Sequence, residues 1–380
     1  MEIQQLGSIQ TDKQTLSAML LVDSDKPSEW MIHGWSNESS DSFAILFDSS
    51  CDGETHNLSP RWFYRVGESN NLFLPRSRTP EEDKLISNLS VVLRQQASGF
   101  SGEWLIKNVG TGKVDFDFSP PEGSHVDATT CKDWDEFKSW ARRIRSEQDA
   151  AMFRGHGCSK FSLTTTLHRT GRRRIERYAA NELRQFCNHA EAVLDKRFNL
   201  DDPEDYSTVL GLAQHHGLPT PLLDWTASPY IAAFFAFSDS LEFQSHRPDS
   251  THVRIYALTR NFIEVASPNI VNLIQARPFA AALDVPPRHN IRLYAQQGRF
   301  LVTNVANVEN FFKFLEKEWN QTFLYAADVP VSVAAEALED LTFMGLTAAT
   351  LFPGMDGVGR MIRHSMLFKR PSFPGLSKQD

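Results

Sequence analysis

The 380-residue sequence lacks several patterns that would assign it directly to a class of protein. No apolar run approaches the roughly 20 residues that a membrane-spanning helix needs. The N-terminus lacks the basic and then apolar layout of a signal peptide. The four cysteines are sparse and follow neither a disulfide nor a zinc spacing. These absences predict a cytoplasmic protein with reduced thiols and no membrane partner.

Signatures of familiar catalytic sites are also missing. The sequence contains neither HEXXH nor CXXC, and the adjacent His215 and His216 would point roughly 100° apart on a helix, which disfavours a shared metal ion. A zinc site built from His156, Cys158 and a later histidine has little support, so no metal is predicted. The nucleophile-elbow pattern GxSxG is absent as well, which disfavours serine hydrolase chemistry.

Charge is distributed unevenly along the chain. The formal net charge is −8, and residues 1–120 hold 10 Lys and Arg against 17 Asp and Glu. Bulk electrostatics therefore disfavour nucleic acid as a partner of the N-terminal part. Basic residues gather later, in the run Arg169, Arg172, Arg173, Arg174 and Arg177. Such a run is usually a solvated helix start, and the alternative is a guide for an anionic polymer.

Short apolar stretches separated by Gly, Ser, Asn and Asp predict a β-rich N-terminal domain over residues 1–118. The alternating runs around Gly110-Thr111-Gly112 indicate a hairpin, and residues 81–96 interrupt the strands with a predicted helix. A small antiparallel barrel or sandwich follows. We expect it to be either a partner-binding or regulatory module or a purely structural domain. Ser119-Pro120-Pro121 opens a linker over residues 119–130.

From residue 131 to 370 helical and strand patterns interleave, which predicts an α+β or α/β domain with a mixed sheet, followed by a polar tail over 371–380. Trp134, Phe137 and Trp140 recur at helical spacing. Residues 150–155 read as a strand that delivers Arg154 at its end. A long helix over 173–198 carries Glu182 within its apolar stripe, where a carboxylate needs a partner such as Arg154 or Arg169.

Polar groups are densest in residues 209–237, VLGLAQHHGLPTPLLDWTASPYIAAFFAF. An apolar helix ends there at Gln214, His215 and His216. Ser228-Pro229 then predicts an N-cap and the first residue of a buried helix. A rigid helix start preceded by polar side chains is a good way to build a pocket.

These motifs together resemble the FRG domain, a bacterial family named after its Phe/Tyr-Arg-Gly tripeptide. The tripeptide reads Phe153-Arg154-Gly155, and the family pattern AQHHG-PT-LLDWT-SP reads Ala213 to Pro229. Further matches are Leu163 to Arg169, Glu182, Gln296 to Phe300, and Phe352 to Gly357. The order fits over residues 130–365, with Pro221 where many members carry Arg. The resemblance implies an α/β domain and a link to bacterial mobile elements and antiviral defence.

The candidate site combines substrate-binding and catalytic side chains from these motifs. Arginine suits phosphate because it offers a planar fork of donors, and histidine transfers protons near neutral pH. We assign substrate binding to Arg154, His156, Gln214, His215 and Trp225, and catalysis to His216, Asp224, Glu182 and Gln296. We expect the guanidinium of Arg154, the imidazole of His216 and the indole of Trp225 to face one hollow.

Three functions remain open for this site. In the first, a defence-type effector binds and processes an NAD-like nucleotide, with Arg154 on phosphate and Trp225 stacked on a ring. This arrangement is similar to ADP-ribosyltransferases, although no [Gln/Glu]-x-Glu occurs and Gln296 would stand in for it. The second is RNA or DNA cleavage with His156 and His216 as acid and base. The third is a non-catalytic nucleotide-sensing adaptor whose β domain recruits a protein partner. No cofactor is predicted, and NAD is a candidate substrate.

Overall fold

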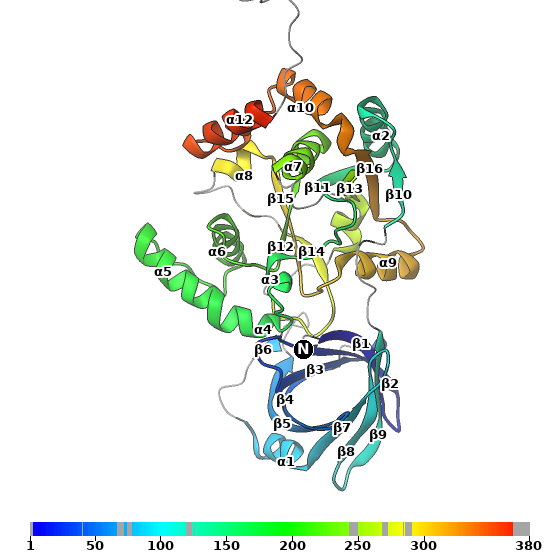
Figure 1. Ribbon diagram of the computed structural model, residues 1–380. Coiled ribbons are helices and arrows are strands. Elements are labelled where there is room, and N and C mark those ends of the chain that lie inside the picture. Colours follow the sequence, from blue (N-terminus) through cyan, green and yellow to red (C-terminus); the bar gives the residue numbers. More distant parts are fainter. Residues whose placement is uncertain are drawn as a thin grey trace, which may run out of the picture.

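The computed structural model describes residues 3–39, 41–66, 72–73, 78–118, 124, 126–242, 250–267, 273–283, 285 and 291–367. Two sheets divide the described chain, one from strands β1 to β9 and the other from β10 to β16. Figure 1 shows the first sheet below and the second above, with helices around the second. Half of the predicted linker and the whole predicted tail lie outside the described residues.

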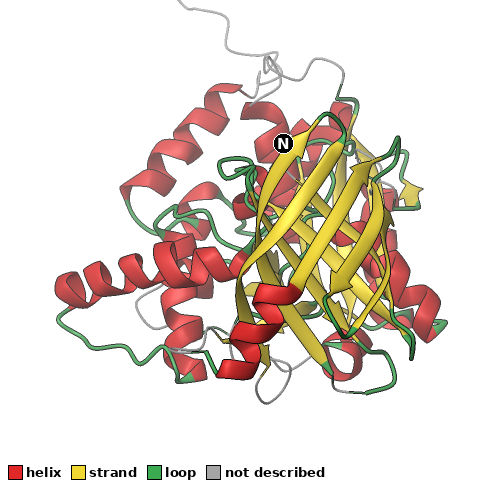
Figure 2. Cartoon of the chain, turned by 90° about the horizontal axis from the view of Figure 1, so that it is seen from below, coloured by secondary structure: helices red, strands yellow, loops and turns green. Residues whose placement is uncertain are grey.

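The first sheet is antiparallel throughout and closes on itself, as the ring of strands in Figure 1 shows; Figure 2 gives the same strands from below. Its order is β4-β3-β2-β1-β9-β8-β7-β5-β6, and an additional pairing of β4 with β5 closes the barrel. The strands are β1 Ile3–Gln10, β2 Thr15–Val22, β3 Glu29–Trp35, β4 Ser42–Asp52, β5 Thr55–Val66, β6 Leu72–Phe73, β7 Leu89–Gln95, β8 Phe100–Ile106 and β9 Gly110–Phe118. Of the two predicted architectures, the barrel is the one formed.

Two local predictions for the barrel were wrong in detail. The helix expected over 81–96 is α1, Pro80–Asn88, because Val91 and Leu93 alternate into the barrel core as part of β7. The turn of the last hairpin lies at residues 107–109, where Asn108 takes a φ of 64°. Gly112 belongs to β9, where it pairs with Trp104 of β8, and a Cβ there would lie 2.0 Å from the carbonyl oxygen of Gln10.

The second sheet is mixed, as predicted. Its order is β10-β16-β13-β11-β12-β15-β14, with β10 and β16 parallel and the other neighbours antiparallel. The strands are β10 Ala128–Thr130, β11 Ala150–His156, β12 Leu222–Thr226, β13 His252–Thr259, β14 Ala280–Leu283, β15 Gly298–Thr303 and β16 Leu324–Pro330. Strand β11 delivers Arg154 near its end, which the sequence predicted.

Helices cover both faces of the second sheet. An apolar cluster joins α2 (Trp134–Glu147), α7 (Pro229–Glu242), α10 (Ala334–Phe343) and α11 (Ala348–Leu351) to Phe153. A different cluster joins α9 (Val308–Trp319) to Met152. Because neighbouring residues of a strand point to opposite sides, the two clusters lie on opposite faces. The remaining helices are α3 Thr166–Arg169, α4 Ile175–Tyr178, α5 Arg184–Leu194, α6 Pro203–His215, α8 Ile291–Ala295 and α12 Met355–Leu367.

The long helix predicted over 173–198 is a composite. A π-helical turn, η2 (Ala179–Leu183), joins α4 to α5. Glu182 lies in this turn, where its side chain is 32% exposed and pairs with Arg172 at 2.9 Å rather than with Arg154 or Arg169. The π turn shifts the helical register, so the stripe read from the sequence places this carboxylate wrongly.

The basic run does not form a free surface. Arg172, Arg174 and Arg177 form ion pairs with the acidic turn between β2 and β3 and with the start of β3. Their partners there are Asp25 for Arg172, Glu29 for Arg174, and both Asp23 and Asp25 for Arg177. The surplus acid of the N-terminal part and the basic run of the second part therefore meet where the two sheets contact.

Candidate functional site

A cavity of about 1080 Å³ opens where two neighbouring strands separate. Phe153 of β11 pairs with Thr226 of β12, and this is the one register pair that the described residues form between these strands. Beyond it, β11 continues along β13 and β12 continues along β15. Antiparallel strands that part in this way leave backbone groups unpaired and space between them. The cavity occupies that space.

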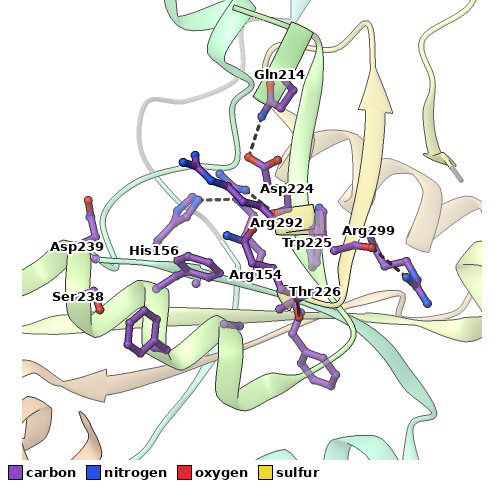
Figure 3. Close-up of a pocket in the computed structure, with 18 of the residues that line it drawn as sticks. Arg154, His156, Gln214, Asp224, Trp225, Thr226, Ser238, Asp239, Arg292 and Arg299 are labelled. Carbon is purple, nitrogen blue, oxygen red and sulfur yellow. Dashed lines mark hydrogen bonds between the residues drawn. The ribbon is translucent and has the colours of Figure 1, made fainter. Parts of the chain in front are cut away.

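The walls come from segments far apart in the chain. Strands β11, β12 and β15 and the segment before α3 contribute to the walls, together with α6, α7, α8 and α12. Figure 3 shows the labelled side chains that meet there. The charged lining residues are Arg154, Lys160, Arg169, Arg292, Arg299 and Arg360, against Asp224, Asp239 and Glu242. Six cationic residues line the cavity against three acidic ones, and this surplus favours an anionic ligand.

Arg154 spans the gap between the separated strands. Its NH1 donates a hydrogen bond of 2.5 Å to the backbone carbonyl of Asp224, so the side chain supplies a bond that a continuous ladder would have made. Gly155 faces the other side, against the backbone of Ala232 in α7, at a distance that leaves no room for a Cβ. Burial lowers the pKa of Arg154, the Asp224 carboxylate opposes this shift, and Arg169 adds to it. Arginine nevertheless keeps its proton in proteins.

His156 lies on the same face of β11, two residues further on. Its Nε2 accepts a hydrogen bond of 3.1 Å from Nε of Arg154, and its Nδ1 lies 3.3 Å from the carbonyl oxygen of Phe161. A carbonyl only accepts, so Nδ1 carries the proton and Nε2 does not. Burial and then the positive charge of Arg154 hold the pKa of His156 well below 6.5. The imidazole is therefore neutral and fixes the orientation of the guanidinium.

The Asp224 carboxylate is exposed and held from one side. Nε2 of Gln214 donates to its Oδ2 at 2.8 Å, and the hydroxyl of Thr220 donates to the amide oxygen of the same Gln214. Gln296 reaches the site from the end of α8, where its Nε2 donates to the carbonyl oxygen of Leu351 at 3.0 Å. Figure 3 shows Gln214, Asp224 and Arg154 following one another across the cavity.

Residues 149–245 match the family model of the FRG domain. The chain carries an FRG domain. The matched segment contains β11, α6, β12 and α7, the elements that hold Arg154, Gln214 and Asp224. No curated protein and no solved structure matches the chain.

The cavity of the FRG domain brings together most, but not all, of the predicted site residues. Arg154, His156, Gln214, His215, Asp224, Trp225 and Gln296 line it. His216 is exposed and is not among the lining residues. It follows the last residue of α6, and its ring stands edge to face against that of His215, with the ring centroids 4.9 Å apart. The expectation that His216 faces the hollow was therefore wrong. Glu182 also lies outside, in its ion pair with Arg172.

Trp225 borders the FRG cavity but is not free to stack on a ligand. Its side chain is 3% exposed and packs in the cluster of α9 with Leu163, Leu258 and Phe312. Alternation along β12 explains this position, because neighbours in a strand face opposite sides and Asp224 points into the cavity. The aromatic rings that line the cavity elsewhere are Phe234 and Phe235 on α7 and Phe352 before α12.

Several lining residues were not assigned to the site from the sequence. Arg169 ends a motif that the FRG resemblance covers, and its position there was the available signal. Arg292 and Arg360 lie in segments without a local pattern, and both guanidinium groups stand near the ring of Phe352, at 5.9 and 4.5 Å from its centroid. Arg299 points away from the group around Arg154 in Figure 3.

Neither metal coordination nor a membrane span emerges from the described part of the chain. Among those residues, no group of three or more His, Cys, Asp and Glu side chains could hold a metal ion. None of their helices combines the length and the apolar character that crossing a membrane requires.

Proposed function

We propose that the FRG-domain cavity binds a nucleotide through its phosphate groups, with an NAD-like dinucleotide as the ligand class. The observation that carries this proposal is the guanidinium of Arg154, fixed by His156 and by the carbonyl of Asp224 at the centre of a cavity with surplus positive charge. A planar fork of donors held in a partly desolvated site is suited to bidentate phosphate recognition.

The size and lining of the cavity support a ligand larger than free phosphate. A volume of about 1080 Å³ lies at the upper end of the roughly 300–1,000 Å³ usual for small-molecule sites. Phe235 and Phe352, whose rings meet edge to face at 5.8 Å, offer apolar surface for a base. In this proposal Phe235 and Phe352, rather than Trp225, provide the aromatic surface on which a base of the ligand stacks.

The arrangement of the cavity supports nucleotide binding better than it supports acid–base catalysis by histidine. His156 is neutral because Arg154 holds the lone pair of its Nε2, and His216 lies outside the lining. The remaining candidate for chemistry is the Asp224 carboxylate, which could stabilise positive charge on a ribose during cleavage of a glycosidic bond. NAD cleavage is therefore the reaction to assay, and binding without turnover corresponds to the adaptor.

Nucleic-acid cleavage is not proposed further. Its support was a free basic run and a pair of histidines acting as acid and base. The basic run instead pairs with Asp23, Asp25 and Glu29. The cytoplasmic location, the bacterial source and the role in antiviral defence that the FRG resemblance implies stay predictions.

The test is calorimetric titration of the purified chain with NAD, ADP-ribose, ADP and adenosine, followed by an assay for NAD loss. We expect the three phosphorylated ligands to bind and adenosine to bind at least about tenfold more weakly. The variant Arg154→Lys keeps the charge but loses the fork, so it should weaken binding about tenfold. Equal affinity for adenosine and ADP would refute phosphate recognition.

Controls separate recognition from folding. Arg142→Gln replaces an exposed arginine on α2, away from the lining, and should leave every affinity unchanged. Arg154→Lys must show the same circular dichroism spectrum as the wild type for its loss of binding to count. NAD loss abolished by Asp224→Asn with binding retained would make the chain an enzyme, and binding without NAD loss would make it an adaptor.

A further inference from the structure

The turn between β2 and β3 reaches from the barrel into the FRG part of the chain. One carboxylate oxygen of Asp23 accepts hydrogen bonds from the backbone amides of Arg173 at 2.6 Å and Arg174 at 2.9 Å. The other accepts from NH1 of Arg177 at 3.0 Å. The amide of Ser24 donates to the carbonyl oxygen of Gly171 at 2.9 Å. A turn of the first sheet thus caps the chain just before α4.

These charged groups are removed from solvent. The side chain of Asp23 is 0% exposed, and that of Arg174 is 4% exposed. Burying such groups costs several kcal/mol per ion unless each is paired and hydrogen-bonded. Apolar residues in the same contact would carry no such desolvation cost. A buried ion cluster with directed hydrogen bonds, such as those that Asp23 accepts, restricts the orientation of the contacting segments more than apolar packing would.

The segment that Asp23 holds leads directly into the cavity wall. Arg173 donates through NH1 to the carbonyl oxygen of His168 at 2.5 Å, which ties it back to α3. Arg169, the last residue of α3, lines the cavity and donates to the carbonyl oxygen of Thr164 at 3.1 Å. Gly171 lies between them with a φ of +82°, so the chain folds sharply back at this point.

We propose that Asp23 is a positioning residue for the ligand site: the barrel turn holds residues 171–174, and through them it places Arg169 in the wall of the cavity. This inference rests on the proposed function for its effect on ligand. It also assigns the barrel a role, because the barrel turn supports the segment that follows Arg169, a residue of the cavity wall. The contact itself can be tested without any ligand.

The ligand-free test is hydrogen–deuterium exchange of the full chain. Asp23→Asn keeps the size of the side chain but removes the charge that accepts from the backbone amides of Arg173 and Arg174 and pairs with the guanidinium of Arg177. We expect exchange of the amides in residues 164–174 to rise about tenfold, with exchange in α7 unchanged. Asp48→Asn is the control, because Asp48 is 55% exposed on the same barrel and pairs with Arg61. Unchanged exchange in 164–174 would overturn the proposal.

The ligand test is a double-variant cycle with ADP as the probe. Asp23→Asn and Arg169→Gln should each raise the dissociation constant about tenfold, and the two together should raise it little further. That result shows that Asp23 acts through Arg169. The positioning role would be overturned if the two substitutions raised the dissociation constant independently, so that their effects multiplied in the double variant. It would also be overturned if Asp23→Asn bound ADP as tightly as wild type. If wild-type protein binds no nucleotide, the proposed function fails, and the exchange experiment still decides whether the turn positions the segment.

Discussion

Nε of Arg154 donates to Nε2 of His156 at 3.1 Å, and the two side chains stand on the same face of β11. Their spacing of two residues follows from strand alternation. The bond requires an unprotonated Nε2, and the charge of Arg154 in turn helps to keep it unprotonated. A histidine next to an arginine at a strand end is therefore an orienting acceptor here and not an acid.

Removing this acceptor should weaken nucleotide binding with little loss of fold. In His156→Ala, Arg154 keeps its bond to the carbonyl of Asp224 but loses the partner of its Nε. We expect the dissociation constant for NAD to rise about tenfold. His189→Ala, which changes an exposed histidine on α5, should have no effect. Titration calorimetry checks both variants.

The same pair predicts a flat pH profile for binding. Because the pKa of His156 lies well below 6.5, this residue stays neutral between about pH 6 and 8. The NAD pyrophosphate does not titrate in that range. The part of the affinity for NAD that depends on His156, taken as the ratio of the dissociation constants of His156→Ala and wild type, should therefore change less than about twofold across it. A fall in affinity that His156→Ala removes would show that the imidazole takes up a proton there.

Replacing Asp224 should test whether its carboxylate repels the phosphate groups of a bound nucleotide or contacts the ligand directly. Asp224→Asn keeps an oxygen that can accept from Gln214 but removes a negative charge from the cavity. Affinity for ADP should then increase about threefold, because the anion no longer faces a carboxylate. Asp52→Asn, on an exposed barrel strand, is the matched control. A loss of ADP affinity in Asp224→Asn would mean that this carboxylate contacts the ligand directly.

Local sequence patterns correctly predicted the helices and strands that are determined by residues close together in the chain. The stripe of Trp134, Phe137 and Trp140 gave a buried face of α2, and the N-cap at Ser228 places the start of α7, with Oγ of Ser228 accepting from the amide of Ile231 at 3.4 Å. The barrel strands followed from alternation. Such signals lie within one element and need no partner from elsewhere in the chain.

The residues whose positions were predicted incorrectly depend on long-range contacts, or on strand and helix geometry that the sequence-based prediction did not take into account. The partners of the basic run lie about 150 positions earlier, at Asp23 and Asp25, so its burial left no local trace. The burial of Trp225 was, however, predictable: adjacent residues of one strand point to opposite faces, and Asp224 already faces the cavity. His216 is exposed while its neighbour His215 lines the cavity, since successive helix positions point roughly 100° apart.

Close packing beneath Arg154 makes Gly155 intolerant of a side chain. A Cβ on this residue would lie 2.0 Å from the carbonyl oxygen of Ala232 and 2.9 Å from Cβ of Ala236, so α7 would have to move. Gly155→Ala should cost roughly 2–3 kcal/mol in the free energy of unfolding. Gly359→Ala in α12 has open space around it and should gain roughly 0.5–1 kcal/mol. Urea denaturation measures both, and equal stabilities would refute the packing argument.

Buried histidines should make the fold sensitive to acid. Burial lowers the pKa of His33 to about 4 and that of His168 to about 3, while both would titrate near 6.5 in the unfolded chain. Between these values the unfolded state binds more protons, so stability is full above about pH 6.5 and is lost as the pH falls. For His33 alone the loss by pH 5 is about 2 kcal/mol.

His33→Gln isolates this contribution. In the wild type, Nδ1 of His33 lies 3.1 Å from the carbonyl oxygen of Ala276, at the contact between the barrel and the second part of the chain. A glutamine amide can donate to the same carbonyl but does not titrate. The stability advantage of wild type over His33→Gln should therefore shrink by about 2 kcal/mol between pH 7.5 and pH 5. If the difference in unfolding free energy between wild type and His33→Gln stays constant over this range, the pKa of His33 is the same in the folded and unfolded chain. The buried position assigned to His33 would then be wrong.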